Sequence, residues 1–472
     1  MWLNNEMSSN GYSDFIKRYP DYVATSEIDQ LRANQYPLLA KEAHVYLDYT
    51  GAELYATSQL QAHHKLLSES LFGNPHSWNP TSTHSTELVE QTRAYILKFF
   101  NASPEEYVCV FTPNSSGALK LVGEAYPFGT GCHYLLTFDN HNSVNGIREY
   151  AHAREASVTY IPVVLPDLRS DEAKLREELA NPNRGCFNLF AYPAQSNFSG
   201  VQHPLEWIAE AQSQGRDVLL DAAAFAPTNR LDLSKWHPDF VPLSFYKMFG
   251  FPTGVGALIA RKETLRKLSR SWFAGGTTTV ASVRGNKFYP AEAPAGLEDG
   301  TLNYLNIPAV EIGLRHLESI GYEMIHERVT CLADWLLENL NDMKHSNSAS
   351  MVKIYGPLTT EARGGTIALN FFDSHGNIIP KHFLEEQANR RNISIRMGFF
   401  CNPGAGEVAL DISGDELSSC FSRPSYEARI PDLDFQRCID PKASGAVRVS
   451  LGLVSNFEDV RAFLEFAEQF LE

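Results

Sequence analysis

Short apolar runs alternate with helical segments from residue 106 onward, and this pattern limits the fold more than any other feature of the sequence. Strands are expected at Tyr107–Phe111, Tyr134–Phe138, Val158–Val164, Cys186–Tyr192, Val218–Leu220 and Val241–Phe245, and helices at Ser116–Tyr126, Val144–Glu155, Asp171–Leu179 and Pro204–Ser213. Repeated strand–helix alternation is typical of a mostly parallel sheet that helices cover on both faces. The alternation therefore predicts an α/β fold with a mostly parallel central sheet flanked by helices.

The last third of the chain follows a different pattern. A long helix that begins near Ile307 suits a bridge to a second domain, and residues 331–472 alternate as a smaller α+β domain. Strands are expected there at Val352–Tyr355, Gly365–Phe372, Ile393–Met397 and Ala446–Ser450, and helices at Cys331–Leu340, Pro380–Arg390 and Glu458–Phe470. We expect an N-terminal segment at 1–43 that packs on the small domain, a large domain at 44–330 and a small C-terminal domain at 331–472.

Composition excludes several classes of protein. The chain is 43% hydrophobic and 20% charged, as soluble globular proteins are. Its net charge of −16, with no dense run of Lys or Arg, argues against nucleic-acid binding and membrane-surface binding. No apolar run approaches the roughly 20 residues that span a bilayer, and the N-terminus lacks a basic segment followed by an apolar one, so no secretory signal is visible.

The seven cysteines are scattered, odd in number and without a CxxC pair. This spacing argues against a disulfide framework and against a structural zinc site, and we predict no metal. A reducing, cytoplasmic compartment fits this cysteine usage best.

Polar side chains follow nearly every predicted strand of the large domain. In open α/β sheets, sites form at the carboxyl ends of the strands. Polar residues at these ends would make one common pocket wall. The residues are Asn114, Ser115, Ser116, His141, Asn197, Asp221 and Lys247.

Each of these residues has an ordinary alternative role. Ser115 and Ser116 precede a glycine and open a helix, which suits phosphate binding but also an ordinary helix cap. His141 could lie flat over a planar ring, although a lone histidine is more often structural. Asp221 could hold a pyridine nitrogen protonated. Lys247 lies between two apolar runs beside a glycine-rich turn, where burial would make its amine nucleophilic, but a lysine at a strand end can also reach water.

Taken together, these residues indicate one kind of site more specifically than any of them does alone. A phosphate cradle, a ring stacker, a pyridinium partner and a lysine follow one another on successive strands, with Ser244 as a further phosphate contact three residues before Lys247. This order predicts a site for pyridoxal phosphate.

Longer motifs carry a resemblance to a known family. They are Tyr46-Leu47-Asp48-Tyr49-Thr50-Gly51-Ala52, Gly73-Asn74-Pro75-His76-Ser77, Asp139-Asn140-His141-Asn142-Ser143-Val144, the block from Ser244 to Gly254 around Lys247, and Phe400-Cys401-Asn402-Pro403-Gly404. From about residue 40 onward, the sequence resembles NifS-like cysteine desulfurases of the class V aminotransferase type. Within that group it is most similar to the N-terminal desulfurase domain of molybdenum cofactor sulfurases. The resemblance implies fold type I of the pyridoxal phosphate-dependent transferases, with the cofactor in the large domain.

The resemblance also implies roles for individual residues. Lys247 would form the Schiff base with the cofactor and shuttle protons, Asp221 would pair with the pyridine nitrogen, and His141 would stack on the ring. Asn197 would lie near the ring hydroxyl and the substrate. Ser115, Ser116 and Ser244 would bind the phosphate, and Thr301 would reach the phosphate of the neighbouring subunit, which implies a homodimer with sites at the interface. Arg448 would bind the α-carboxylate of the substrate.

Cys401 decides the chemistry that the resemblance implies. The segment Arg396-Met397-Gly398-Phe399-Phe400-Cys401 resembles the Arg-x-Gly-x-x-Cys loop of the desulfurases, whose cysteine takes sulfur from the substrate as a persulfide. Such attack needs a thiolate on a mobile, partly exposed loop. The alternative is an inert, buried thiol.

Three features depart from the family pattern. Ala224 stands where bacterial desulfurases often have a glutamine that contacts the ring hydroxyl. Residues 404–406 lack the further cysteine of the molybdenum cofactor sulfurases, and the 472 residues do not include the domain that presents that cofactor, so we expect no sulfuration of it by this chain alone.

Three functions remain open. The first is a cysteine desulfurase or C–S lyase that converts L-cysteine to L-alanine and passes sulfur from Cys401 to an acceptor protein or small molecule. The second is a lyase, epimerase or other pyridoxal phosphate enzyme acting on a different amino acid. The third is a non-catalytic scaffold, which would have no need for Lys247, Asp221, His141 and Arg448 together.

Overall fold

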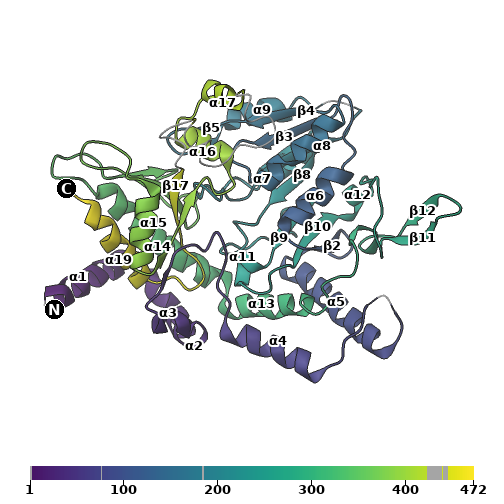
Figure 1. The fold of residues 1–472 in the computed structure, drawn as a ribbon, viewed down its shortest axis with the longest axis horizontal. Coiled ribbons are helices and arrows are strands. Elements are labelled where there is room, and N and C mark those ends of the chain that lie inside the picture. Colours follow the sequence, from purple (N-terminus) through teal and green to yellow (C-terminus); the bar gives the residue numbers. More distant parts are fainter. Residues whose placement is uncertain (1–2, 76, 183–184, 423–437, 439–444) are drawn as a thin grey trace.

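A seven-stranded sheet forms the centre of the larger part of the molecule (Figure 1). The structure, a computed structural model, describes residues 3–75, 77–182, 185–422, 438 and 445–472; His76 of the quoted loop lies outside them. Across the sheet the strands are β2 (Tyr107–Thr112), β10 (Gly256–Arg261), β9 (Phe240–Ser244), β8 (Asp217–Asp221), β7 (Asn188–Pro193), β3 (His133–Thr137) and β4 (Ser157–Ile161). Only β10 runs antiparallel to its neighbours. The mostly parallel sheet is therefore confirmed.

Helices cover both faces of this sheet. Because successive side chains of a strand point to opposite faces, Tyr134 and Leu136 of β3 pack with α6 (Ser115–Ala125) and α8 (Ile147–Ala153), whereas Leu135 belongs to a second core. That second core contains α5 (Pro80–Phe99) and α13 (Ile307–Ile320). Figure 1 shows the two layers of helices on either side of the strands. The chain thus has the predicted three-layer α/β architecture.

Short elements fill the connections of the larger part. They are β1 (Val45–Tyr46), α4 (Thr57–Glu69), α7 (Asn142–Asn145), β5 (Val163–Val164), β6 (Arg169–Ser170), α9 (Glu172–Leu179), α10 (Trp207–Ser213), α11 (Tyr246–Phe249), α12 (Lys262–Leu265), β11 (Thr278–Ser282), β12 (Lys287–Pro290) and the 3₁₀ turn η2 (Ala295–Leu297). Strands β11 and β12 form a hairpin that stands away from the rest of the molecule (Figure 1).

A second, four-stranded antiparallel sheet lies in the C-terminal part. Its order is β13 (Val352–Tyr355), β14 (Thr366–Phe371), β17 (Ala446–Ser450) and β16 (Arg396–Gly398), while β15 (Ile393–Ser394) pairs with β1. The helices of this part are α14 (Tyr322–Asp342), α15 (Lys381–Arg390), α16 (Pro403–Ala409), α17 (Gly414–Phe421) and α19 (Phe457–Ala467), followed by η5 (Glu468–Phe470). The long helix expected from Ile307 is divided, because Gly321 adopts a φ of 89° between α13 and α14.

The N-terminal residues contact the helices of the C-terminal part. They form α1 (Leu3–Arg18), η1 (Pro20–Thr25), α2 (Glu27–Gln35) and α3 (Pro37–Lys41). Arg32 forms an ion pair with Asp459 of α19, and Phe15 packs against Trp335 of α14. These contacts agree with the expected place of residues 1–43, and the division at residues 43 and 330 stays a prediction.

The prediction about disulfides was wrong. Cys132 is bonded to Cys186, and Cys420 to Cys438. Cys132 precedes β3 and Cys186 precedes β7, and these strands are neighbours, so the two Cα atoms lie 5.1 Å apart. The order of strands in a sheet is not visible in the sequence, which is why spacing alone missed the pair. Cys109 and Cys331 are free and buried, and Cys401 is free and exposed.

The helices of the described ranges are too short or too polar to cross a lipid bilayer. The predicted cytoplasmic compartment stays a prediction.

Candidate active site

A cavity of about 180 Å³ lies at the carboxyl ends of the parallel strands. Most of the predicted site residues line it, and they come from the ends of five strands: β2, β3, β7, β8 and β9. Parallel strands bring their carboxyl ends to one edge of the sheet, so residues far apart in sequence meet there. The predicted residues in the lining are Ser115, Ser116, His141, Asn197, Asp221, Ser244 and Lys247.

One end of the cavity suits a phosphate group. Helix α6 begins here, and its N-cap is Asn114, whose side chain accepts a hydrogen bond from the Gly117 N–H at 2.9 Å. Ser115 donates its N–H to Ser244 Oγ at 3.0 Å, and Ser116 Oγ lies 2.7 Å from Ser143 Oγ. Because Asn114 caps the helix, the serine hydroxyls are not needed for capping. A helix N-terminus with hydroxyl groups beside it attracts anions.

Lys247 lies in the single turn of α11, directly after β9. Burial lowers its pKa, the Asp221 carboxylate opposes this shift, and Arg448 adds to it. Its ammonium has no hydrogen-bond partner among the described residues. The turn lies close to residues 53–55. Only glycine fits at position 250, because a Cβ there would lie 2.5 Å from the backbone of Leu54. A buried, unpaired lysine amine is poised for attack on a carbonyl group.

His141 and Asp221 face the same cavity as Lys247. His141 Nδ1 accepts a hydrogen bond from the Ser143 N–H at 3.1 Å, so the neutral ring carries its proton on Nε2. Burial lowers the pKa of His141, and the neighbouring Lys247 lowers it further. Asp221 ends β8, and its Oδ1 accepts from the Ala223 N–H at 3.0 Å. A neutral imidazole and a carboxylate fit, respectively, the face and the nitrogen of a pyridine ring.

Cys401 lies outside the lining of the cavity, on a loop that is anchored beside it. Its backbone carbonyl accepts a hydrogen bond from the Asn142 N–H at 2.7 Å, next to His141. Phe400 and Cys401 both adopt positive φ angles, 54° and 55°, which non-glycine residues rarely do. Such strain concentrates at functional sites. The thiol is free and exposed, so Cys401 is not the buried cysteine of the alternative, and its catalytic role stays a prediction.

Asn197 ties the Cys401 loop to the larger part of the molecule. Its Nδ2 donates to the Phe400 carbonyl at 2.7 Å, and its Oδ1 accepts from Asn402 Nδ2 at 2.9 Å. Asn402 also caps α16 by accepting from the Ala405 N–H. The loop is therefore fixed on both sides of Cys401.

Arg448 lies beside the cavity without lining it. It donates from Nη1 to the Asn197 carbonyl at 3.1 Å and from Nη2 to Asp48 Oδ1 at 3.0 Å, and its guanidinium stacks over Phe400. Burial lowers its pKa, with the Asp48 carboxylate acting in the opposite direction. A buried guanidinium between the cavity and the Cys401 loop can bind a carboxylate.

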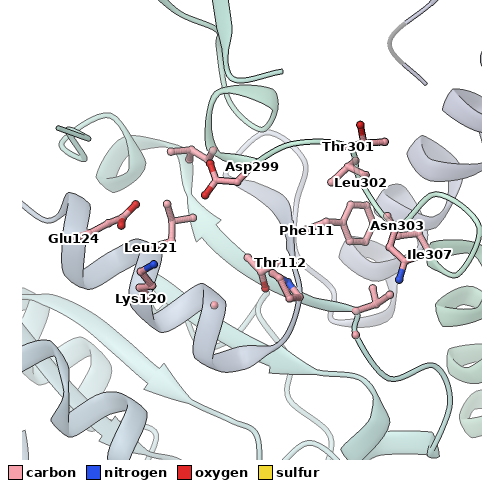
Figure 2. A pocket seen from close by; sticks show the side chains of 15 residues that line it. Phe111, Thr112, Lys120, Leu121, Glu124, Asp299, Thr301, Leu302, Asn303 and Ile307 are labelled. Carbon is pink, nitrogen blue, oxygen red and sulfur yellow. The ribbon is translucent and has the colours of Figure 1, made fainter. Parts of the chain in front are cut away.

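Thr301 is a predicted residue that lines a different cavity, whereas Cys401 and Arg448 lie beside the first one. This second cavity, of about 330 Å³, lies between the start of α6 and residues 297–303. Figure 2 shows Thr301 with Asp299 and Asn303 across this cavity from Lys120. Its separation from Lys247 agrees with the expected role toward a neighbouring subunit, which stays a prediction.

Sequence reasoning gave no role to several residues that shape this site. Asp48 and Arg396 belong to quoted motifs, yet only their contacts reveal that they reach Arg448. Asn142 and Asn402 fix the Cys401 loop, and both also lie in quoted motifs. Their presence in these motifs was the available signal. Gln195 and Tyr246 line the cavity as well.

The family model for class V aminotransferases matches residues 45–463 of the chain. The chain belongs to the class V aminotransferase family. It is 39% identical over 461 residues to the molybdenum cofactor sulfurase of Bos taurus, a match that covers 93% of this chain and 51% of that protein. The chain thus spans about half the length of the curated relatives it matches.

Solved structures of cysteine desulfurases share the fold of this class V chain. The apo cysteine desulfurase of Thermococcus onnurineus NA1 has a TM-score of 0.75 and 22% identity, over 94% of this chain and 98% of that one. The cystine C–S lyase C-DES, in complex with its product cysteine persulfide, has a TM-score of 0.68 and 18% identity, over 93% of this chain and all of that one. The predicted fold class is confirmed.

Membership of the class V family also confirms pyridoxal phosphate as the cofactor and the chain as an enzyme. The residues of the cavity fit that group. The unpaired lysine amine suits its aldehyde, and the carboxylate suits its pyridine nitrogen. The neutral imidazole suits the face of its ring. The helix N-terminus, with three serine hydroxyls nearby, suits its phosphate.

Proposed function

We propose that this chain is a cysteine desulfurase, which converts L-cysteine to L-alanine and leaves a persulfide on Cys401. The observation that supports this most is the exposed, free thiol of Cys401 on a strained loop anchored beside the cavity of Lys247. A negative charge on the Cys401 sulfur would raise the pKa of both Lys247 and Arg448, so the three groups lie within electrostatic reach of one another. A thiolate there can receive sulfur from a substrate that Arg448 and Lys247 hold.

Bound pyridoxal phosphate supplies an electron sink for the charge that develops at Cα of the amino acid. Ser115, Ser116, Ser244 and the N-terminus of α6 would hold the phosphate. Asp221 would accept a hydrogen bond from the protonated ring nitrogen. His141 would cover one ring face, and its Nε2 proton could be donated. Lys247, whose pKa burial lowers, would bind the cofactor through its amine and could move protons.

The substrate is an amino acid whose α-carboxylate binds the guanidinium of Arg448. Asn197 orients that guanidinium through its carbonyl. It lines the cavity and would lie near the ring hydroxyl of the cofactor. Ala224 lines the same wall with a methyl group only, so Asn197 has fewer polar neighbours there than in the bacterial pattern. L-cysteine is the proposed substrate because its side chain carries the sulfur that the exposed thiol of Cys401 could accept.

The sulfur step needs no external oxidant or reductant. Cys401 Sγ attacks the sulfur of the substrate, an S–S bond forms, and the Cβ–S bond breaks. The electron pair of the broken bond stays with carbon, and protons complete the methyl group of alanine. Cysteine plus thiol gives alanine plus persulfide, with equal atoms and electrons on the two sides.

The proposal includes a homodimer and a sulfur acceptor. The hairpin β11–β12 exposes Val280, Val283 and Tyr289 to solvent, and an isolated two-stranded hairpin is only marginally stable in water. A second copy of the chain would cover it and would receive Thr301 at its phosphate.

The proposed sulfur acceptor is a protein or small molecule, and the proposed compartment is the cytoplasm. The longer relatives are named molybdenum cofactor sulfurases, and the match covers about half of their length. We propose sulfuration of that cofactor only for a chain that also contains the other half.

Mixing the purified holoenzyme with L-cysteine tests the proposal. Alanine and sulfide are expected to form with a reducing agent present, and Cys401→Ser is expected to stop their formation while the cofactor absorption is retained. Cys331→Ser is the matched control, because that thiol is also free but buried. Wild-type turnover by Cys401→Ser would contradict the assignment of Cys401.

A C–S lyase is the second candidate. The observation that favours it is that Cys401 does not line the cavity, whereas Lys247, sufficient for an elimination, does. In that case pyruvate rather than alanine would form, and Cys401→Ser would act like the wild type. Epimerase or other chemistry on a different amino acid would form neither product from L-cysteine.

A further inference from the structure

Asp48 joins the two arginines that lie between the cavity and the Cys401 loop. Its Oδ1 accepts a hydrogen bond from Arg448 Nη2 at 3.0 Å, and its Oδ2 accepts from Arg396 Nη2 at 2.6 Å. Arg396 Nε also lies 3.0 Å from both carboxylate oxygens. The side chain of Asp48 is largely buried. One carboxylate therefore bridges two guanidinium groups.

The strand register explains why a carboxylate is needed at this position. Arg396 of β16 and Arg448 of β17 are directly opposite each other in an antiparallel pair. Like charges in this arrangement repel each other. The backbone of Asp48 forms a bridge with Ser450 at the end of β17, which brings the carboxylate to the pair. Gly51 permits the close approach, because a Cβ there would lie 2.6 Å from both Arg396 Nη2 and Asp48 Oδ2.

The charges in this group leave one positive charge unmatched. Two guanidiniums face one carboxylate, and the buried Nε of Arg448 has no hydrogen-bond partner among the described residues. One α-carboxylate would supply the missing charge and the missing acceptor. It would also compete with Asp48 for the Arg448 guanidinium.

The two arginines differ in what they are attached to. Arg448 is buried, touches Asn197 and stacks on Phe400. Arg396 is half-exposed and opens the short strand that leads into Phe400 and Cys401. A shift of the Asp48 carboxylate from Arg448 toward Arg396 would thus act directly on the segment that carries the thiol.

We propose that Asp48 is a positioning residue that couples the binding of the substrate carboxylate at Arg448 to the placement of Cys401. This inference rests on the proposed function, which assigns Arg448 to the carboxylate and Cys401 to the sulfur. When a carboxylate binds Arg448, Asp48 pairs with Arg396 alone and draws the Arg396–Cys401 segment toward the cavity. The thiol then becomes less accessible from solvent.

Alkylation of Cys401 in the holoenzyme measures this coupling without relying on turnover. Iodoacetamide labelling is followed by mass spectrometry of the Cys401 peptide, in saturating L-alanine or in saturating L-alaninamide, which lacks the carboxylate. In the wild type, labelling is expected to be about tenfold slower in L-alanine than in L-alaninamide, the factor that one charge-assisted hydrogen bond corresponds to. In Asp48→Asn the two rates are expected to be equal.

A second variant and a control keep the test independent of misfolding. Arg396→Gln breaks the bridge on the side away from Arg448, and its two labelling rates are also expected to be equal. Arg390→Gln, on the exposed face of α15, is expected to keep the wild-type ratio. Equal labelling rates of Cys401 in L-alanine and L-alaninamide in the wild type would overturn the inference. So would a difference as large as that of the wild type in both Asp48→Asn and Arg396→Gln. Coupling without formation of alanine from L-cysteine would overturn the proposed function and leave the role of Asp48 intact.

Discussion

At the scale of single residues, the site depends on two side chains whose charged forms are disfavoured by burial. Burial lowers the pKa of both Lys247 and His141, and the neighbouring Lys247 lowers the pKa of His141 further. The Asp221 carboxylate opposes both shifts. The neutral forms are the ones that can act as nucleophile and as ring cover. This balance gives a pH dependence that can be measured at one side chain.

Labelling of Lys247 in the folded apoprotein is expected to occur at lower pH than in the unfolded chain. A neutral amine reacts with an acylating reagent and a protonated one does not, so labelling is lost as the pH falls through the folded-state pKa. Because that pKa is lowered, the midpoint lies below the ordinary value of 10.5. Mass spectrometry of the Lys247 peptide gives the midpoint, and the protein in urea is the control. Equal midpoints in the two states would contradict the burial of this amine.

At the scale of elements, the start of α16 holds the Cys401 loop in place. Asn402 caps this helix, and the same side chain reaches Asn197 and the Asp139 carbonyl. One residue thus links the stability of a short helix to the position of Cys401.

Asn402→Ala is expected to destabilise the protein by about 1–2 kcal/mol, the cost of a lost helix cap, and to slow formation of the Cys401 persulfide while cofactor binding is retained. Ser413→Ala is the matched control, because Ser413 caps the neighbouring α17 in the same way and has no contact with Asn197 in the described structure. Urea unfolding and persulfide mass measurements check the two effects. If both variants slowed the reaction equally, the loss would be one of general stability.

His133, at the start of β3, is expected to make the free energy of unfolding depend on pH. His133 accepts a hydrogen bond from Arg216 at Nδ1, and burial together with that guanidinium lowers its pKa from 6.5 to about 4. The unfolded chain binds a proton below pH 6.5 that the folded chain does not bind until about pH 4. The free energy of unfolding should therefore fall by about 2 kcal/mol from this residue between pH 7 and pH 5.

Urea unfolding of the wild type and of His133→Gln at the two pH values measures this contribution. The variant is expected to lose less stability than the wild type on acidification, whatever its stability at pH 7. An identical loss in both proteins would show that His133 is protonated in the folded state.

Individual strands were predictable from the sequence, but several contacts between them were not. The strand–helix alternation predicted β2, β3, β7, β8 and β9 to within a residue or two, because each is a short apolar run bounded by turns. Residues that follow these strands were predicted to meet, since parallel strands share one edge. The contacts of Arg448 were not predictable. Arg396 lies opposite it only through the register of β16 on β17, and Asp48 reaches it through the bridge to Ser450. The Cys132–Cys186 bond was missed for the same reason, because it depends on the order of strands across the sheet.

At the scale of the whole molecule, two sheets meet at the site. The larger sheet supplies Lys247, Asp221 and His141, and the smaller one supplies Arg448 and the strand that leads to Cys401. The protruding hairpin β11–β12 and the cavity of Thr301 belong to surfaces that a second copy would complete (Figures 1 and 2).

Val283→Asp is expected to weaken the proposed homodimer by about tenfold or more, because a charge would have to be buried without a partner. Val283 is 99% exposed at the tip of the hairpin, so its replacement has little effect on the fold of one chain. Light scattering over a range of concentrations gives the mass. Leu358→Asp, at an exposed aliphatic residue outside the hairpin, is the control. A wild-type chain that is monomeric at micromolar concentration would contradict the dimer.

The central claim is that Cys401 takes sulfur from L-cysteine held at Lys247 and Arg448. Its most direct test is the mass of the Cys401 peptide after the holoenzyme has been mixed with L-cysteine in the absence of reducing agent. The account predicts that this peptide gains the mass of one sulfur atom, that one alanine forms for each sulfur gained, and that Lys247→Ala gains none. An unmodified Cys401 peptide in an enzyme that nevertheless turns over L-cysteine would contradict it.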